Sequence, residues 1–385
     1  MHAAALRSSK EIAAFHQVPA LIYRDDANYI PHLRQDIDKL FDPKRNKLLV
    51  DGAAERWVFY NDDQPFGRVA AFINPKTAQI EDQPTGGIGF FECIDSQSHA
   101  AFIFDTAKTW LAERGMEAMD GPINFGERNQ FWGCLTKNFT DPNSYAMNYN
   151  PAYYPTLFER YGFGVYFEQY LYKRLVHLPM PEVFKRKMDQ LSELHKITVR
   201  NMDEVELKTI AAYFLEVYNG AWGGHAGFKA MTMEGALKVM KALKPIINKN
   251  VVYFAFAGTK PIGFFINIPE LNELFKYLNG NLNWWGKIKF LYYKTFHPPK
   301  TMVGIVFGVV REWHRRGVEG ALIFRAGEML VGKSYQTIVM TWVGDFNPKM
   351  IKVCENLGAE RYREMKTYRY LFDRNKPFER CRTAE

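Results

Sequence analysis

Residues 301–330, TMVGIVFGVVREWHRRGVEGALIFRAGEML, carry the strongest fold signal in this chain. They begin with an apolar run typical of a buried strand, continue into a basic turn that contains glycine, and end in an apolar helix. A second apolar run, TIVMTWVG (337–344), and the segment DFNPKMIKVCENLGA (345–359) follow. A strand, a helix and a second strand in this order, among other amphipathic helices and short apolar strands, predict an α/β (α+β) fold.

The turn between the first strand and the helix is a candidate anion site. The first amides of a helix have no partner inside it, and the helix dipole adds partial positive charge there. Arg315 and Arg316 supply two full charges beside these amides. One interpretation is a pocket for a phosphorylated ligand. The other is an ordinary strand-to-helix turn with a basic surface pair, because short glycine motifs are weak signals.

The order of strand, RRGVEGAL turn (315–322), helix, strand and NPKM…LGA (347–359) resembles the C-terminal half of the GNAT acyltransferase fold. In that family the turn binds the pyrophosphate of an acyl-coenzyme A. The resemblance therefore implies acyl-CoA, such as acetyl-CoA, as co-substrate. The residues that it implies for coenzyme binding are Val309, Val310, Arg315, Arg316, Gly317, Val318, Glu319, Gly320, Ala321 and Asn347.

Two positions of the turn depart from the family pattern. Glu319 stands where the family usually has a second glycine, and His314 stands where it usually has Gln or Arg. A carboxylate beside a pyrophosphate is electrostatically unfavourable. We therefore expect weaker or differently arranged phosphate binding, unless Gly320 takes over by a shift of one residue.

The chain also resembles itself in three places that follow the same order. The matching pairs of segments are 56–74 with 251–269, 100–119 with 320–340, and 150–163 with 347–359. Such self-similarity predicts two copies of one domain, and 385 residues suit about two domains. We predict two tandem GNAT-like domains, 1–178 and 179–385, each a mixed, mostly antiparallel twisted sheet flanked by helices.

Composition narrows the possible binding partners and cellular location of the protein but does not identify either. The net charge of +8 suits an anionic ligand, but it equally suits RNA or an acidic membrane surface. No apolar run is long enough for a transmembrane segment, and the N-terminus does not read as a signal peptide. Four scattered cysteines form no disulfide framework, so a reducing cytoplasm is the simplest expectation. No histidine cluster has metal-ligand spacing, so we expect no metal.

Acyl transfer to an amine needs a donor for the carbonyl oxygen, a base for the amine and an acid for the departing thiolate. The resemblance places the carbonyl donor in the backbone of 308–310, where Gly304 and Gly308 permit a bulge. At the position of the family's usual tyrosine acid the chain has Cys354, which fits a packed core residue better than an acid. The corresponding position in the first copy is Phe158.

Three other residues are candidates for catalysis. Tyr368 is a substitute acid, although strand tyrosines are commonly structural. Asp345 is a candidate base, with an Asx turn or a helix cap as the alternative role. Glu127, in the polar-aromatic loop 121–134, is an alternative base.

The expected substrate residues lie in the glycine-rich loop YNGAWGGHAGF (218–228), and they are Tyr218, Asn219, Trp222 and His225. An ordinary loop anchored by Trp222 is the alternative. The first copy has IDSQSHA (94–100) in place of the basic turn, and Asp95 there would repel phosphate. We therefore expect the first copy to lack a coenzyme site and to serve as scaffold or substrate wall.

The second copy also has an insertion, residues 271–300, with two adjacent tryptophans and five lysines. A lid, an interfacial membrane helix and an RNA-stacking surface are three functional interpretations. We favour a fourth, a core-packing helix pair with snorkelling lysines.

Taken together, these features favour an N-acyltransferase that moves an acyl group from acyl-CoA to an amine of a small molecule or peptide, with the chemistry in the second copy. A Fem-like transferase that uses aminoacyl-tRNA, and so binds nucleic acid, is one alternative. A non-catalytic binding protein that keeps the fold is the other, because fold alone does not fix function.

Overall fold

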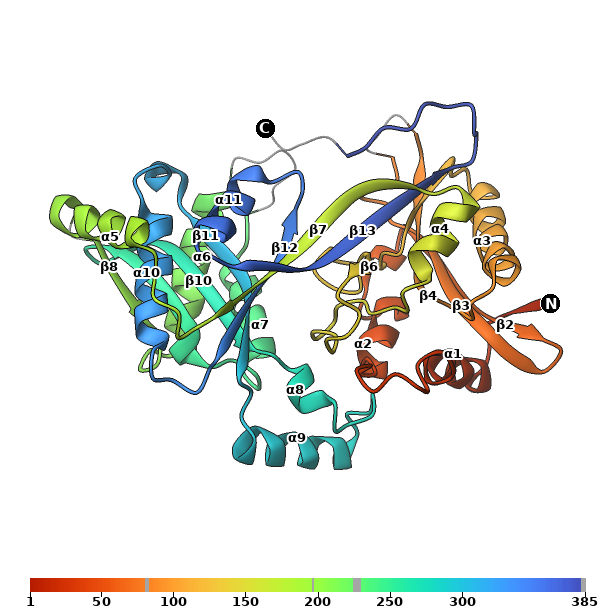
Figure 1. Cartoon of the computed structure of the whole chain (residues 1–385), viewed down its shortest axis with the longest axis horizontal. Coiled ribbons are helices and arrows are strands. Elements are labelled where there is room, and N and C mark those ends of the chain that lie inside the picture. The colour runs from red at the N-terminus through yellow and green to blue at the C-terminus, as the bar shows by residue number, and fades with distance from the viewer. Residues whose placement is uncertain (80–82, 196, 224–229, 382–385) are drawn as a thin grey trace.

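The computed structural model describes residues 1–79, 83–195, 197–223 and 230–381. Two lobes lie side by side, and two long strands cross from one to the other (Figure 1). The elements of the first half of the chain are β1 (His2–Ala5), α1 (Ser9–Ile22), α2 (Arg34–Asp38), two short 3-10 helices (Lys39–Phe41 and Lys47–Leu49), β2 (Ala53–Asn61), β3 (Gln64–Ile73), β4 (Thr85–Cys93), α3 (Gln97–Ala112), β5 (Ala118–Gly121), β6 (Cys134–Lys137), α4 (Tyr154–Tyr161) and β7 (Gly164–Leu175).

The second half repeats this order after one additional helix, with two helices inserted before its fourth strand and with no strand among the described residues at the place of β6. Its elements are α5 (Glu182–His195), β8 (Ile197–Asn201), α6 (Leu207–Trp222), α7 (Met233–Leu243), a 3-10 helix (Lys249–Val251), β9 (Val252–Ala257), β10 (Lys260–Pro269), α8 (Asn272–Phe275), α9 (Trp284–Phe296), β11 (Thr301–Val309), a 3-10 helix (Arg311–Trp313), α10 (Val318–Leu330), β12 (Thr337–Gly344), α11 (Pro348–Asn356) and β13 (Glu360–Leu371). The doubled order and the mixed α/β architecture confirm the fold predicted from the sequence.

One sheet of 13 strands runs through both lobes, in the order β1-β2-β3-β4-β5-β13-β7-β12-β11-β10-β9-β8, with β6 paired to β13. Most neighbours are antiparallel, whereas β4 with β5 and β11 with β12 are parallel. The two halves exchange their last strands. Strand β13 pairs with β5 of the first half, and β7 pairs with β12 of the second. The sheet therefore belongs to both halves of the chain.

Helices cover both faces of the sheet in each lobe. In the first lobe α1 contacts β2, β3 and β4, while α3 packs on β3 and β4 with α4 beside it. In the second lobe α6 packs against α7, β10 and β11, and α10 packs against β8, β9, β10 and the additional helix α5. Apolar side chains fill each interface. Phe104 and Phe158 are fully buried in one core, and Phe254 and Phe264 in another.

The insertion 271–300 forms α8 and α9, which lie below the junction of the two lobes (Figure 1). Leu274 and Phe275 of α8 are buried, so α8 packs as the sequence analysis favoured. Helix α9 does not, because Gly286 is its one buried residue. The interpretation of the insertion as a core-packing pair is therefore wrong for α9.

Candidate functional site

An opening lies between the two parallel strands of the second lobe. Strands β11 and β12 are paired from Thr301 with Thr337 to Gly304 with Met340, and they diverge beyond that point. A bulge at Ile305 shifts the register of β11 against β10, and β12 is irregular between Met340 and Val343. Bulges bend a strand and disrupt its pairing. The two strands therefore separate toward their carboxyl ends, beside Gly304 as the sequence pattern allowed.

The end of β11 directs one backbone amide into this opening. The N–H of Val310 donates to the carbonyl of Ile262 on β10 at 2.9 Å. Because bonding alternates along an antiparallel pair, the N–H of Val309 points away from β10, toward β12. The carbonyl of Val309 lies 2.8 Å from His314 Nε2. Of the expected pair, Val309 therefore offers a donor to the opening and Val310 does not.

The turn before α10 presents a run of free amides. Arg315 and Gly317 have left-handed φ values of +62° and +90°, and α10 begins directly afterward. The first helical bond in this region is from Ala321 N–H to the Gly317 carbonyl, at 3.0 Å. In the part of the chain that the structure describes, no protein acceptor receives a hydrogen bond from the N–H groups of residues 315–320.

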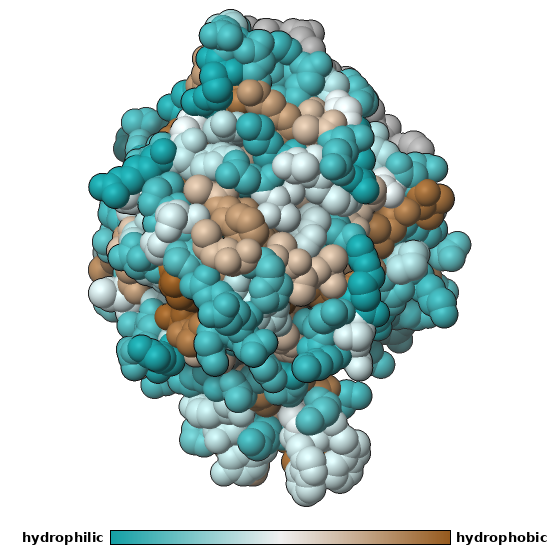
Figure 2. Space-filling view, turned by 90° about the vertical axis from the view of Figure 1, so that its right-hand side faces the viewer, coloured by the Kyte–Doolittle hydropathy of each residue, from teal (hydrophilic) through white to brown (hydrophobic). Residues whose placement is uncertain are grey.

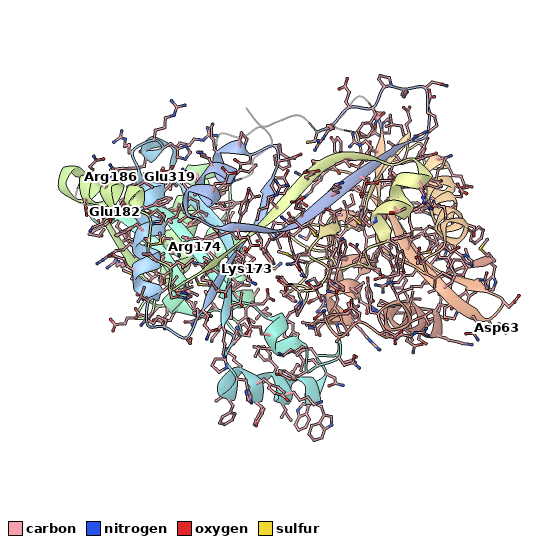
Figure 3. All side chains as sticks on the ribbon, in the orientation of Figure 1. Asp63, Lys173, Arg174, Glu182, Arg186 and Glu319 are labelled. Carbon is pink, nitrogen blue, oxygen red and sulfur yellow. The ribbon has the colours of Figure 1, made fainter. Side chains whose placement is uncertain are left out.

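The charges around the turn are mixed. Arg315 and Arg316 are exposed, and the Arg316 guanidinium lies 5.1 Å from the centre of the Trp313 ring. Glu319 is half-buried in the first turn of α10, while Val318, Gly320 and Ala321 are buried. Helix α5 packs against α10, and Figure 3 shows Glu319 at the end of α10 near Glu182 and Arg186 of α5. The turn that carries the free amides therefore includes two arginines and one carboxylate.

An apolar cavity of about 320 Å³ extends from the opening between β11 and β12 along the side of α10. Its lining comes from α10, both strands, β10, α11 and its flanks, the end of α6, and β7 with the segment after it: Arg174, Val176, Met180, Trp222, Phe265, Gly304, Ile305, Val306, Phe307, Ile323, Ala326, Gly327, Leu330, Ile338, Met340, Thr341, Trp342, Val343, Asn347, Met350 and Leu357. Few of these side chains are polar, so the cavity suits an apolar ligand group.

The four residues expected to bind substrate differ in their positions relative to the cavity. Trp222 lines the cavity, and its ring is stacked on Tyr218 with 5.0 Å between the ring centres. Asn219 instead holds the two ends of its loop together, because its side-chain amide exchanges two hydrogen bonds with the backbone of Met231. His225 lies outside the residues that the structure describes.

The three candidate catalytic residues lie apart. Asp345 follows β12 and forms an ion pair with Arg380. Tyr368 is fully buried in the first lobe, where its OH donates to Glu159 at 3.0 Å and where burial raises the pKa of its phenol. Glu127 is exposed on a first-lobe loop. The strand exchange explains the position of Tyr368. This residue belongs to β13, and β13 pairs with β5 in the first lobe, away from α11.

Two further residues that the sequence analysis considered lie at α11: Asn347 directly before it and Cys354 within it. Asn347 caps α11, since its side chain accepts a hydrogen bond from the N–H of Met350 at 3.2 Å. Cys354 is buried, and burial raises the pKa of its thiol to about 12. A thiol in this state is a core residue, as the sequence analysis favoured.

The corresponding place in the first lobe is nearly filled. A cavity of about 30 Å³ lies there, against Arg68, Glu92 and Tyr154. Arg68 and Glu92 form a buried ion pair at 3.3 Å, and Tyr154 donates to Glu92 at 2.7 Å. Burial raises the pKa of Glu92 in spite of these partners. Before α3, Ser96 bonds His99 and leaves the first amides of α3 without a side-chain cap.

Most residues that line the cavity were not singled out from the sequence, and Arg174 and Met180 are the two from outside the predicted strand–turn–helix unit and loop that matter most here. Arg174 lies at the end of β7, which the predicted boundary assigned to the first copy, and Met180 lies in the segment after β7, just inside the second copy. One signal was available. Gly327 lies inside an apolar helix, where glycine is unfavourable and marks a close approach. A Cβ there would lie 2.5 Å from the sulfur of Met180.

The described residues contain no group of His, Cys, Asp and Glu side chains that could hold a metal ion. Within the same residues, every helix is too short or too polar to cross a bilayer.

Comparisons with known proteins find two relatives that match over most of both sequences, and solved structures with a similar fold. The chain is 24% identical to Protein YghO of Escherichia coli (strain K12) over 370 residues, covering 94% of this chain and 93% of the relative. It is 23% identical to the Bacterial ceramide synthase of Caulobacter vibrioides (strain NA1000 / CB15N) over 368 residues, covering 94% and 95%. No family model matches the chain.

Solved structures agree with the architecture. A tandem GNAT protein from the clavulanic acid biosynthesis pathway superimposes with a TM-score of 0.53 at 9% identity, over 97% of this chain and 99% of that one. The GCN5-related glucosamine N-acetyltransferase region of a fungal β-N-acetylglucosaminidase gives 0.54 at 12%, over 96% of this chain and 38% of that one. With its repeated order of elements and its diverging parallel strands, this chain has the tandem GNAT fold.

Proposed function

We propose that the second lobe is an N-acyltransferase that moves an acyl group from acyl-CoA to an amine. The observation that carries this proposal is that one strand–turn–helix unit brings together three features: the amides of residues 315–320, which have no acceptor in the described protein, the amide of Val309, and an apolar cavity lined by β11, β12 and α10. Phosphate oxygens, a thioester carbonyl and an acyl chain need these surroundings in this order. The Fem-like and non-catalytic alternatives have no comparable observation in their favour.

In the proposed reaction the amine nitrogen attacks the thioester carbonyl carbon. A carbon–nitrogen bond forms, the carbon–sulfur bond breaks, and the amine proton leaves as the thiolate departs and is protonated. The Val309 N–H donates to the carbonyl oxygen as negative charge develops on it. We keep Asp345 as the candidate base, because it lies two residues from the cavity-lining Asn347. The positions of Tyr368 and Glu127 do not support a role for either.

The size and the lining of the cavity favour a long acyl chain over an acetyl group. Each methylene that enters an apolar cavity contributes about 0.8 kcal/mol, which is about a fourfold gain in affinity. The Caulobacter relative is named a ceramide synthase, and a ceramide is a long-chain base whose amine carries a fatty acyl group. We therefore propose a fatty acyl donor, with a long-chain amine as a specific candidate for the acceptor.

The first lobe serves as scaffold in this proposal. Its cavity is small and occupied by the ion pair of Arg68 with Glu92, and its turn before α3 has neither glycine nor arginine. We expect one coenzyme for each chain.

Calorimetric titration with acetyl-CoA and with acyl-CoAs of increasing length tests the proposal. We expect one site for each chain and affinity that rises with chain length. The double variant Arg315→Gln and Arg316→Gln should bind every acyl-CoA at least tenfold more weakly, because each guanidinium contributes to phosphate binding.

The matched control is Arg24→Gln with Arg34→Gln, which removes the same charge from exposed positions of the first half. Equal weakening in both double variants would assign the effect to net charge. Absence of binding by the wild type at millimolar acyl-CoA would refute the proposed co-substrate.

A further inference from the structure

Helix α9 exposes a broad apolar arc to solvent. Trp284, Trp285 and Phe296 have 68%, 67% and 66% of their surface exposed, and Leu291 has 61%. Ile288 and Tyr292 are exposed between them. In an α-helix these positions lie on one side, since residues separated by three, four or seven share a face. Exposed aromatic side chains packed together on one helix face mark an interaction surface.

The opposite side of α9 fixes the helix to the molecule. Tyr293 stacks on Tyr277 with 3.7 Å between ring centres, and Phe290 lies 5.8 Å from Phe275 of α8. Asn283 caps the helix by accepting a hydrogen bond from the N–H of Gly286 at 2.9 Å. The helix is therefore held in place without its apolar arc, which leaves that arc available to a partner.

Lysines border the arc on both sides. Lys287 and Lys294 lie along one edge of the helix and Lys289 along the other, and all three are exposed. The sequence from 274 to 311 has five lysines and no Asp or Glu. A pocket of about 490 Å³ beside α9, next to Phe290, is lined by Lys244, Lys249 and Lys294 and by one carboxylate, Asp203. The arc thus lies within a positive field.

The insertion projects beyond the rest of the molecule. It forms the lowest part of Figure 1, and Figure 2, turned about the vertical axis, shows the same end extending below the main surface. A flat surface can therefore reach α9 without contact with the lobes. The 13 residues of α9 are too few to span a bilayer, for which about 20 are needed.

We propose that α9 docks the protein on an anionic membrane, lying in the plane of the interface. The six aromatic and aliphatic side chains of the arc enter the boundary between headgroups and acyl chains, and the lysines contact lipid phosphates. Charge complementarity favours an anionic membrane as the partner, because the charged residues that border the apolar arc on α9 are all lysines. A second copy of the chain would bring like charges together. The proposal does not depend on acyl transfer.

Vesicle co-sedimentation tests the docking surface. We expect the wild type to bind vesicles that mix phosphatidylcholine with phosphatidylglycerol more tightly than phosphatidylcholine alone. The double variant Trp284→Glu with Leu291→Glu should lose at least tenfold in partition coefficient, because it places charges within the apolar arc. Its control is Val50→Glu with Val331→Glu, which makes the same change at positions that are 73% and 66% exposed elsewhere.

A second pair of variants tests the lysines. Lys287→Gln with Lys289→Gln should lower binding to the anionic vesicles about tenfold or more and reduce its salt dependence. Lys10→Gln with Lys76→Gln is the control, since both lysines are exposed in the first half. Circular dichroism and melting temperature should match the wild type in all variants, because each changed side chain is exposed.

Insertion depth gives an independent readout. Lipids with brominated acyl chains should quench wild-type tryptophan fluorescence, and Trp284→Phe with Trp285→Phe should bind vesicles but lose that quenching. Failure of the wild type to bind either vesicle would overturn the proposal, as would equal binding by the Glu variant at α9 and its control. A wild-type dimer that the α9 variant converts to monomer, without vesicle binding, would assign the arc to a second copy instead.

Discussion

Arg174 shows how one buried side chain holds the wall of the cavity together. It is 7% exposed, and its guanidinium donates to the carbonyls of Leu357, Leu175, Leu178 and Pro179 at 2.8 to 3.1 Å. Burial lowers its pKa without abolishing its charge. The variant Arg174→Met removes this donor from all four carbonyls, although the Leu175 carbonyl keeps the N–H of Leu178 at 3.4 Å. We expect a loss of about 2–4 kcal/mol in the free energy of unfolding, measured by urea denaturation.

Lys173 is the matched control for this change. It is the preceding residue of β7, its side chain is 39% exposed, and its ion pair with Asp141 spans 3.7 Å (both β7 residues are labelled in Figure 3). A surface pair of this kind contributes at most about 1 kcal/mol. Lys173→Met should therefore remain close to the wild type. Equal stability of the two variants would show that the carbonyls find other donors.

Strand β11 illustrates what glycine permits at the level of an element. A Cβ on Gly308 would lie 2.7 Å from the ring of Trp222, whereas one on Gly304 would lie 3.2 Å from the ring of Phe265. Gly308→Ala must therefore displace Trp222 from its place at the cavity. We expect a cost of about 1–3 kcal/mol and a smaller cost for Gly304→Ala. Near-ultraviolet circular dichroism should report the moved tryptophan in the first variant alone, and identical spectra would contradict the tight contact.

The elements of the second half were largely predictable from local pattern. Strand β12 begins and ends where the apolar run TIVMTWVG does, and α11 begins at Pro348 directly after its cap Asn347, as capping rules require. Helix α10 begins at Val318, inside the stretch assigned to the turn, because Gly317 takes the left-handed position before it. Local signals of this kind depend on neighbouring residues, which the sequence displays directly.

Two features depended on contacts that the sequence does not display. An apolar alternation marks β13 as a buried strand but does not say which strands it pairs with, so the exchange with the first lobe was not foreseen. Tyr368, a candidate acid for the second copy, lies in the first lobe for this reason. Helix α9 has aromatic residues around most of its circumference, a pattern typical of buried helices. Only the packing of the lobes shows that one side of it meets solvent.

The exchanged strands make the whole molecule one folding unit. Strand β13 lies between β5 and β7, so the first lobe completes its sheet with residues from the far end of the chain. Strand β7 reaches the second lobe in the same way through β12. We expect a single calorimetric unfolding transition, whose calorimetric and van't Hoff enthalpies agree.

A cut between residues 178 and 179 separates the two predicted repeats, but it also divides the strands of the shared sheet between two fragments. Each retains one exchanged strand that lacks its partners and exposes an unpaired strand edge, which favours aggregation over folding. We therefore expect neither fragment alone to show a cooperative transition, whereas co-expression of the two from separate reading frames should restore a complex that melts as the intact chain does. The co-expressed pair is the control for the cut in the backbone. Cooperative unfolding of fragment 1–178 alone, near the transition temperature of the full chain, would show that the first lobe is stable without β13 and that the exchange joins two independent domains.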